Sequence, residues 1–346
     1  MSQPSRESAL HRFFLRFWYQ AKPNIIARCF YPLSQLFFYL AAKRRIKLSH
    51  QAQSFNVPVV VIGNISVGGT GKTPLIISLA NALNAQGHNV GIVSRGYGSQ
   101  APYYPYEIDA KTQVNTSGDE ALLIAQATHL PVIIGADRVA AVQALLENYP
   151  ATQIILSDDG LQHYRLHRDH EIILIDGNKG LGNGYGLPAG PLREPKTRLA
   201  DAQAIVVNGE VSSALAKDLK GLAFTQIQLE PLAWSPVAHP NNNQKISVEK
   251  GLPWQGQVIA IAGIGNPQRF FESLTNLGVD FMPIVFDDHH IFTASDFDEF
   301  VNDTIVMTSK DAVKCRDVAP KNSWQLEVEC PLPNSILTPI NKILNN

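Results

Sequence analysis

The strongest constraint on the fold of this chain is one glycine-rich segment, Ser66-Val67-Gly68-Gly69-Thr70-Gly71-Lys72-Thr73. It follows a strand-like run at 57–63 and opens a stretch of helical periodicity at 73–86. Glycines let successive backbone N–H groups turn toward phosphate oxygens, and the start of a helix adds partial positive charge. A strand, this loop and a helix in that order predict a P-loop NTPase-type α/β fold.

The rest of the chain supports a mainly parallel sheet with helices on both faces. Short β-branched runs alternate with helical patterns, which is typical of βαβ units. The runs lie at 89–94, 131–135, 153–157, 170–176 and 202–208. Residues 231–256 are rich in Pro, Asn and Gln, which predicts a linker or exposed hairpin. We therefore expect an N-terminal helical arm (1–50), a P-loop core (51–230), that linker, and a smaller C-terminal α/β domain (257–346).

The N-terminal arm is basic, although the chain as a whole has a formal net charge of −1. Residues 1–50 hold nine of the 29 Lys and Arg residues and one of the 30 acids, Glu7. Apolar residues recur there at helical spacing, first at Leu10, Phe13, Phe14, Phe17, Trp18 and Ala21, then at Leu33, Leu36, Phe37 and Leu40.

This pattern predicts amphipathic helices that lie on an anionic membrane surface, with packing on the protein's own core as the alternative. Arg28 and Pro32 interrupt the best apolar stretch, so we expect no helix that spans a bilayer. Pro32, Ser34 and Gln35 also count against a signal peptide.

Composition excludes several other classes of protein. The net charge gives no indication of nucleic-acid binding, and we infer no protein partner. Cys29, Cys315 and Cys330 are odd in number and widely spaced, which argues against a disulfide framework or a zinc site.

A second acidic motif completes a nucleotide site. The apolar run at 154–156 leads through Ser157 into Asp158 and Asp159, which places two carboxylates at the carboxyl end of a predicted strand. Carboxylates there could bind Mg²⁺ together with the hydroxyl of Thr73. The alternative is an Asp-Gly turn at Asp159-Gly160, but such a turn needs only one aspartate.

With these motifs, the chain resembles the tetraacyldisaccharide 4′-kinase (lipid A 4′-kinase) family over nearly its whole length. The motifs that carry the resemblance are 63–74 around the phosphate loop, Ser94-Arg95-Gly96-Tyr97-Gly98, Gly118-Asp119-Glu120, Asp158-Asp159-Gly160-Leu161-Gln162-His163, 187–195, 262–267 with Arg269-Phe270-Phe271, and Asp288-His289-His290. Two positions depart from the family pattern. Ser309 stands where we expect Glu, and Lys179 stands where we expect Arg.

The resemblance implies transfer of the γ-phosphoryl group of ATP to the 4′-hydroxyl of a tetraacyldisaccharide 1-phosphate, at the cytoplasmic face of the bacterial inner membrane. Residues 66–73 and Arg95 would bind ATP, with Lys72 on the β- and γ-phosphates. Thr73, Glu120, Asp158 and Asp159 would hold Mg²⁺. Arg193, in the rigid loop between Pro191 and Pro195, would meet a phosphate group.

The general base is also implied by the resemblance. It would be Asp119, with His289 as its partner. From the residues alone, Asp119 and Glu120 fit a helix N-cap with a first-turn acid, and His289 and His290 could be surface histidines. The competing functions are a P-loop metallochaperone or regulatory NTPase without a lipid acceptor, and a non-enzymatic membrane adaptor. The chain has no CxxC or His-rich tract to hold a metal, and an adaptor leaves the phosphate loop unexplained.

Overall fold

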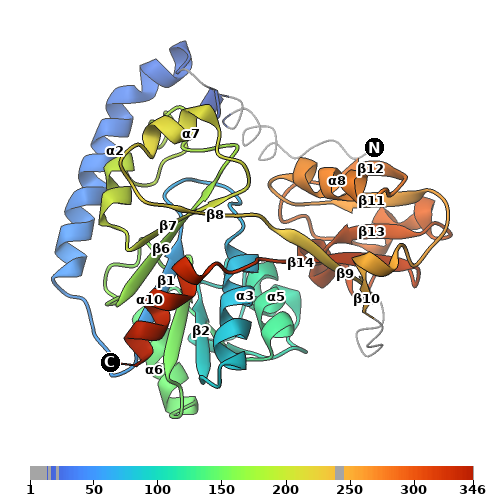
Figure 1. The fold of residues 1–346 in the computed structure, drawn as a ribbon, viewed down its shortest axis with the longest axis horizontal. Helices are drawn as coiled ribbons and strands as arrows, with labels where there is room; N and C mark the ends of the chain where they lie inside the picture. Colours follow the sequence, from blue (N-terminus) through green and yellow to red (C-terminus); the bar gives the residue numbers. More distant parts are fainter. Residues whose placement is uncertain (1–13, 15–16, 21–22, 238–244, 346) are drawn as a thin grey trace.

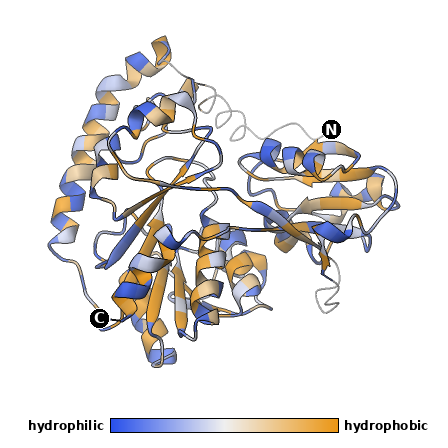
Figure 2. Ribbon diagram, viewed as in Figure 1, coloured by the Kyte–Doolittle hydropathy of each residue, from blue (hydrophilic) through white to orange (hydrophobic). Residues whose placement is uncertain are grey.

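The computed structural model describes residues 14, 17–20, 23–237 and 245–345. Two α/β lobes lie side by side, joined by the chain between β8 and β9 and by the segment that follows β14 (Figure 1). Hydrophobic residues concentrate on the strands of both sheets (Figure 2).

The larger lobe contains an eight-stranded sheet in the order β3-β4-β2-β5-β1-β6-β7-β8. All neighbouring strands are parallel except β3 and β4. The strands are β1 (Val59–Gly63), β2 (Val90–Ser94), β3 (Tyr106–Ile108), β4 (Val132–Ile134), β5 (Ile154–Asp158), β6 (His170–Asp176), β7 (Ala204–Asn208) and β8 (Thr225–Ile227). The helices are α3 (Lys72–Ala85), α4 (Val114–Ser117), α5 (Asp119–Thr128), α6 (Arg138–Asn148), α7 (Ser213–Asp218), α10 (Asn334–Leu344) and the 3₁₀ helix η1 (Lys196–Asp201).

The central strand β1 shows why helices cover both faces of this sheet. Successive side chains of a strand point to opposite faces, so a strand covered on both faces carries a continuous apolar run. Val60 and Ile62 pack in one core with residues of α3, α5 and α10. Val59 and Val61 pack in another core with residues of α6. The P-loop-type sheet expected from the sequence is confirmed.

The smaller lobe contains a six-stranded sheet in the order β10-β9-β14-β13-β11-β12. Its strands are β9 (Glu230–Pro236), β10 (Ile246–Ser247), β11 (Val258–Ala262), β12 (Phe281–Val285), β13 (Ile305–Thr308) and β14 (Ser323–Glu329). Its helices are α8 (Pro267–Asn276), α9 (Ser309–Cys315) and the 3₁₀ helices η2 (Val248–Lys250), η3 (Ala294–Asp296) and η4 (Asp298–Phe300).

In the segment 231–256, expected as a linker or exposed hairpin, β9 and β10 pair antiparallel and belong to the sheet of the smaller lobe. Strand β9 pairs antiparallel with β14, and Trp234 of β9 is fully buried in the core of the smaller lobe. Prolines at both ends of β9 obscured this strand in the sequence. The C-terminal boundary also differs, because Ile336 and Ile340 of α10 pack in the core of the larger lobe.

The structure corrects the expected interruption of the N-terminal arm at Pro32. Pro32 does not end a helix, because a single helix, α2, runs through it from Ile25 to Ser49. Asn24 caps this helix by accepting a hydrogen bond from the Ala27 amide at 2.9 Å. Phe14, Phe17 and Trp18 are helical as expected, whereas Leu10, Phe13 and Ala21 lie outside the described residues.

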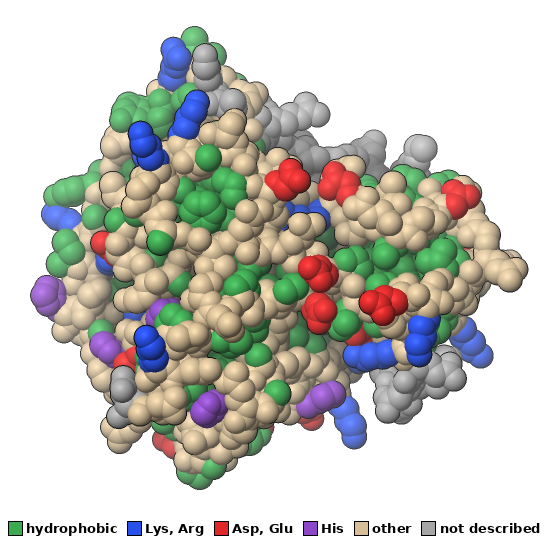
Figure 3. All heavy atoms as spheres, in the orientation of Figure 1, with side chains coloured by type: hydrophobic (Ala, Val, Ile, Leu, Met, Phe, Trp, Pro, Cys, Tyr) green, Lys and Arg blue, Asp and Glu red, His purple; other side chains and the backbone are tan. Residues whose placement is uncertain are grey.

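Helix α2 lies along the flank of the larger lobe and is mostly exposed (Figure 1). By length and composition alone it could cross a membrane, contrary to the expectation from the interrupted apolar run. Buried helices and signal sequences meet the same criterion, so this is weak evidence. Hydrophobic side chains and Lys or Arg side chains alternate along this flank (Figure 3). The large apolar residues exposed on α2 are Ile25, Tyr31, Leu33, Leu36, Tyr39, Leu40 and Ile46.

Candidate active site

Polar residues gather where the parallel strands of the larger lobe end. Asn64 follows β1, while Ser94, Asp158, Asp176 and Asn208 end β2, β5, β6 and β7. The carboxyl ends of parallel strands meet at one edge of the sheet, which is where ligands bind in such folds. All five side chains are buried. Buried polar groups need hydrogen-bond partners, and these side chains find theirs within the site.

Two of these residues anchor the phosphate loop between β1 and α3. The Asn64 side-chain amide donates to the carbonyls of Ser66 at 2.7 Å and Gly68 at 3.3 Å. The Asn208 side-chain amide donates to the carbonyl of Thr70 at 2.9 Å. The loop carbonyls are thus held by buried side chains of the sheet edge.

The loop amides face the other way. In a trans peptide the C=O and the following N–H point in opposite directions, so anchored carbonyls turn the next amides away from the anchors. Gly68 and Gly71 have φ of 110° and 96°, values that glycine adopts without strain. No described residue accepts a hydrogen bond from the amides of Gly68, Gly69 or Gly71. Free amides at a helix N-terminus can bind phosphate oxygens.

Lys72, the first residue of α3, faces the acidic pair. Its Nζ lies 3.2 Å from Oδ1 of Asn64 and 3.5 Å from Oδ1 of Asp159. Arg193 donates to both carboxylate oxygens of Asp159 at 3.4 Å. Burial favours a higher pKa for Asp159, but Lys72, Arg193 and Arg138 outweigh it and lower the pKa. Asp159 is therefore a carboxylate held between two cations.

Asp158 has a different environment. It is buried, and its Oδ2 accepts a hydrogen bond from the Ser94 hydroxyl at 2.9 Å. Burial raises its pKa to about 6, and the nearby negative charges of Glu120 and Asp159 act in the same direction. Its Oδ1 has no hydrogen-bond partner among the described residues. A buried carboxylate oxygen without a partner is costly and favours a bound cation.

This set of donors fits Mg²⁺, which prefers oxygen ligands and usually shares its coordination with phosphates and water. Asp158 and Asp159 supply carboxylates at the end of β5, and Thr73 supplies a hydroxyl in the first turn of α3. Within the described part of the chain, no group of three or more His, Cys, Asp or Glu residues could hold a metal by itself. A cation here would therefore need oxygen ligands from a nucleotide.

A histidine–aspartate pair joins the two lobes beside this edge. Nδ1 of His289, in the loop after β12, lies 2.9 Å from Oδ2 of Asp119, the first residue of α5. Oδ1 of Asp119 accepts a hydrogen bond from the Glu120 amide. The residue before it is Gly118, with φ of 79°, where a Cβ would clash with the carbonyl of Tyr97. The glycine thus permits the turn that presents Asp119.

The pair is strongly polarised. Burial favours a higher pKa for Asp119, but the His289 hydrogen bond and the positive charge of Lys310 lower its pKa to about 2. The same hydrogen bond raises the pKa of His289. An ionised carboxylate only accepts hydrogen bonds, so His289 donates through Nδ1. The structure therefore brings together two residues 170 positions apart, and His289 is not a free surface histidine.

Lys310, in α9, completes the contact between the lobes. Its Nζ lies 3.0 Å from Glu120, 3.4 Å from Asp288 and 3.8 Å from Asp119. Glu120 is thus paired with a lysine of the other lobe. His290 has a different partner, since its Nε2 lies 3.2 Å from Asp296.

Lys179 and Ser309, the two positions that depart from the family pattern, both contact the smaller lobe. Lys179 donates to the carbonyl of Gly265 in the smaller lobe at 3.3 Å. Ser309 donates to the carbonyl of Leu326 within that lobe at 3.1 Å. Arg95 is exposed just after β2.

Sequence reasoning assigned no role to several residues of the site, among them the following three. Asn208 anchors the phosphate loop, Lys310 bridges to Glu120, and the buried Arg138 donates to the carbonyl of Asp158 at 3.0 Å. Asn208 and Lys310 could have been found by one signal, because each lies at or just after the carboxyl end of a strand. Arg138 gives no such signal, since a basic residue in the first turn of a helix is ordinarily exposed.

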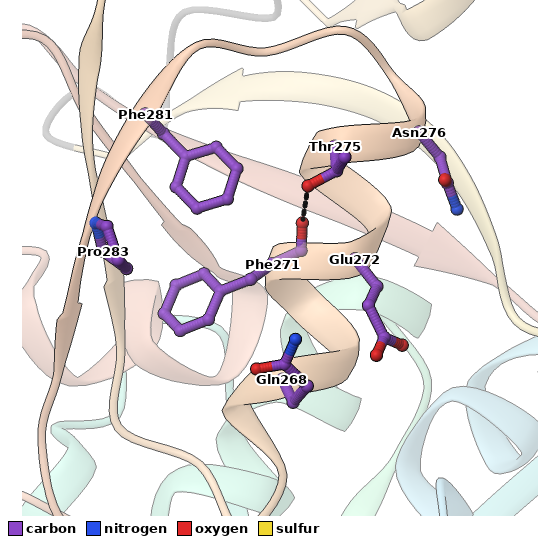
Figure 4. A pocket seen from close by; sticks show the side chains of 7 residues that line it. All are labelled: Gln268, Phe271, Glu272, Thr275, Asn276, Phe281 and Pro283. Atoms are coloured by element: carbon purple, nitrogen blue, oxygen red, sulfur yellow. Dashed lines mark hydrogen bonds between the residues drawn. The ribbon is translucent and has the colours of Figure 1, made fainter.

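A hollow of about 450 Å³ lies elsewhere, against α8 and β12 of the smaller lobe. Figure 4 shows the rings of Phe271 and Phe281 next to each other, stacked with centroids 5.6 Å apart, and the Thr275 hydroxyl bonded back to the Phe271 carbonyl. None of the residues that line it belongs to the phosphate loop or to the histidine–aspartate pair.

Comparison with known proteins agrees with this geometry. The family model described as tetraacyldisaccharide-1-P 4′-kinase matches residues 26–345. The tetraacyldisaccharide 4′-kinase of Francisella tularensis subsp. novicida (strain U112) is 41% identical over 324 residues, covering 90% of this chain and 97% of the relative. The enzyme of the same name from Francisella tularensis subsp. holarctica (strain LVS) is 40% identical with the same coverage.

A solved structure shares the fold. It is that of LpxK from Aquifex aeolicus, described as an "apo" form in complex with ATP. It aligns with a TM-score of 0.71 and 24% identity, over 92% of this chain and 99% of that one. The chain belongs to the tetraacyldisaccharide-1-P 4′-kinase family, the enzymes that phosphorylate a lipid A precursor.

Proposed function

We propose that the protein transfers the γ-phosphoryl group of ATP to the 4′-hydroxyl of a tetraacyldisaccharide 1-phosphate, with Asp119 and His289 as the proton-accepting pair. The observation that carries this proposal is the 2.9 Å contact between His289 and Asp119, made from two lobes. In a switch NTPase the acceptor is water, which a single side chain beside the nucleotide can orient. The similar Aquifex aeolicus protein was solved in complex with ATP, which further supports ATP as the donor.

The nucleotide is held by the phosphate loop and its neighbours. Lys72 and the loop amides of Gly68, Gly69 and Gly71 bind the β- and γ-phosphates, whereas the Val67 amide donates to the Pro191 carbonyl at 2.8 Å. Arg95 lies at the rim of the same sheet edge. Thr73 and one or both of Asp158 and Asp159 hold Mg²⁺, with Glu120 as a further acid nearby. When bound, Mg²⁺ neutralises charge that develops on the phosphates.

Asp119 receives the proton of the acceptor hydroxyl. As the oxygen–phosphorus bond to the 4′-oxygen forms, the bond between the γ-phosphorus and the bridging oxygen breaks and ADP leaves. A carboxylate with a pKa of about 2 is a weak base in the ground state. The transition state of phosphoryl transfer is loose, so the hydroxyl becomes acidic late and needs a base only then. His289 holds the carboxylate in place through its hydrogen bond.

Arg193 is assigned to phosphate binding. It already lies beside Asp159, at the same edge as Lys72, with about a third of its side chain exposed. A guanidinium can contact a phosphate group through two N–H bonds.

A transfer assay separates this function from the alternatives. With γ-labelled ATP and the defined disaccharide acceptor, label is expected on the lipid, and ATP consumption is expected to depend on the acceptor. ATP hydrolysis at the same rate without acceptor, and no labelled lipid, would instead identify a regulatory NTPase.

We further propose that α2 seats the enzyme on the anionic cytoplasmic face of the bacterial inner membrane. The support is the exposed apolar residues along α2 and the basic cluster Lys43, Arg44 and Lys47 near its end. Arg45 is excluded from this cluster because it pairs with Asp201 at 2.8 Å. Interfacial helices combine these two features.

Replacing Lys43, Arg44 and Lys47 together with glutamine should weaken binding to vesicles that contain phosphatidylglycerol. Each basic residue near an anionic surface contributes roughly 1 kcal/mol, so the loss is expected to be about 100-fold at ~0.15 M salt. Co-sedimentation measures it. The control replaces the exposed Lys111, Lys250 and Lys321, which changes net charge equally at positions outside α2, two of them in the smaller lobe. Equal binding by both variants would contradict this orientation.

A further inference from the structure

A short part of the N-terminal arm is packed against the core rather than exposed. Trp18 is buried, and its Nε1 donates to the carbonyl of Pro188 at 2.9 Å. The amide of Asn183 donates to the carbonyl of Trp18 at 2.7 Å. A Cβ on Gly182 would lie 2.5 Å from that same carbonyl, so only glycine allows so close an approach. These contacts fix the position of the next residue, Tyr19.

Tyr19 contacts the phosphate loop directly. Its hydroxyl donates to the carbonyl of Val67 at 2.6 Å. The ammonium of Lys179 lies 5.7 Å from the centre of its ring, within reach of a cation–π interaction. Burial, together with the nearby negative charge of Asp176, raises the pKa of Tyr19 to about 12. The hydroxyl therefore keeps its proton and remains a donor at physiological pH.

This bond sets the orientation of one loop peptide. The Val67 carbonyl points to Tyr19, so the Gly68 N–H points away from Tyr19. Asn64 and Asn208 hold the carbonyls of Gly68 and Thr70 in the same manner. The Val67–Gly68 peptide has particular need of an anchor, because glycine permits rotations that other residues resist. Gly68 is also exposed, so packing does not restrain it.

We propose that Tyr19 is a positioning residue of the phosphate loop, so that the ATP site is complete only when the N-terminal arm is seated on the core. The inference rests on the proposed ATP-binding role of this loop. It assigns the arm a second task besides membrane contact. Of the three side chains that hold loop carbonyls, Asn64 and Asn208 come from the sheet edge of the larger lobe and Tyr19 comes from the arm.

Replacing Tyr19 with phenylalanine removes the hydroxyl and keeps the ring. Loss of one hydrogen bond that orients a single amide should weaken ATP binding by about 3- to 10-fold. Direct titration of the full-length protein with ATP and Mg²⁺ measures this. In the transfer assay, KM for ATP should rise by a similar factor while kcat changes little. The matched control is Tyr39→Phe, because Tyr39 is exposed on α2 of the same arm. It should bind ATP as the unmodified protein does.

A second variant tests whether seating of the arm is the cause. Trp18→Ala removes the contact with Pro188, so it should weaken ATP binding to a similar degree. Because both residues would act through one contact, the double variant should be no worse than Trp18→Ala alone.

The ATP titrations test the role of Tyr19, and the transfer assay tests the proposed function, so either can fail without the other. Unchanged ATP affinity in Tyr19→Phe would overturn this inference, even with the kinase activity intact. An equal loss in Tyr39→Phe, or losses that multiply in the double variant, would also overturn it. If labelled phosphate never reached the lipid, the proposed function would fail, while the ATP titrations would still decide the role of Tyr19.

Discussion

Replacing Lys72 with alanine should nearly abolish phosphoryl transfer and leave the fold intact. The Lys72 ammonium is the one cation contributed by the phosphate loop itself, and it lies at the start of α3, between Asn64 and Asp159. Removing one preorganised donor of charge stabilisation typically costs about 10²–10³-fold in rate, and here the donor also binds ground-state phosphates. The measurement is the initial rate of label transfer to the disaccharide acceptor.

The fold should survive because the neighbours of Lys72 keep other partners. Asp159 retains its contact with Arg193, and Asn64 retains its bonds to the Ser66 and Gly68 carbonyls. Circular dichroism and the unfolding midpoint check this point. Lys217→Ala, at an exposed position on α7, is the control for loss of a lysine. Turnover close to normal in Lys72→Ala would remove the phosphate loop from the mechanism.

The sequence predicted the features that local rules determine. The phosphate loop follows β1 and precedes α3 as expected, and Asp158 and Asp159 lie at the carboxyl end of β5. The phosphate loop and the acidic pair are each recognised from a pattern only a few residues long, in which an apolar run leads into glycines or acids. The parallel order of the sheet brings these two segments to one edge, since β1 pairs directly with β5.

Features that depend on distant partners could not be predicted from those patterns. Strand β9 is defined by its pairing with β14, about ninety positions further along the chain, and its own prolines suggest a loop. Helix α2 continues through Pro32, and the buried Ser34 accepts a hydrogen bond from the Gly186 amide at 2.8 Å. Such tertiary contacts can outweigh the cost of one interrupted helical bond.

The contacts of the candidate site residues with distant partners could not be predicted from the sequence patterns either. From the residues alone, Asp119 looked like part of a helix cap, and its pairing with His289 was expected only through the family resemblance. Lys310, which bridges both lobes, was not expected at all. No sequence period connects α5 with the loop after β12 or with α9. Their contact depends on how the two lobes sit against each other, which is a property of the complete fold.

Asp119→Asn should lower kcat by about 10²–10⁴-fold with little change in ATP affinity. Asparagine keeps the shape of the side chain and an oxygen that can accept the bond from the Glu120 amide, but it cannot accept a proton. If Asp119 served only the start of α5, asparagine would replace it at little cost and activity would survive. A large rise in KM for ATP would point instead to Mg²⁺–nucleotide binding.

The same variant should change the titration of His289. Its raised pKa depends first on the hydrogen bond that it donates to Asp119, while burial and the positive charge of Lys310 act to lower it. In Asp119→Asn the pKa of His289 should therefore fall, which nuclear magnetic resonance of the imidazole can follow. An unchanged titration would show that the two residues are not coupled in solution.

A double-mutant cycle then tests whether Asp119 and His289 act as a unit. His289→Ala should also lower kcat, because the carboxylate loses the group that holds it. If the pair acts together, the variant with both substitutions should be far less impaired than the product of the two single effects.

His290→Ala is the matched control, since this neighbouring histidine lies 3.2 Å from Asp296 and makes no contact with Asp119 among the described residues. Losses that multiply in the cycle would contradict a coupled pair even if each residue proved important alone. Asp119 and His289 lie in different lobes, so strong coupling would also mean that the reaction proceeds only when the two lobes are in contact.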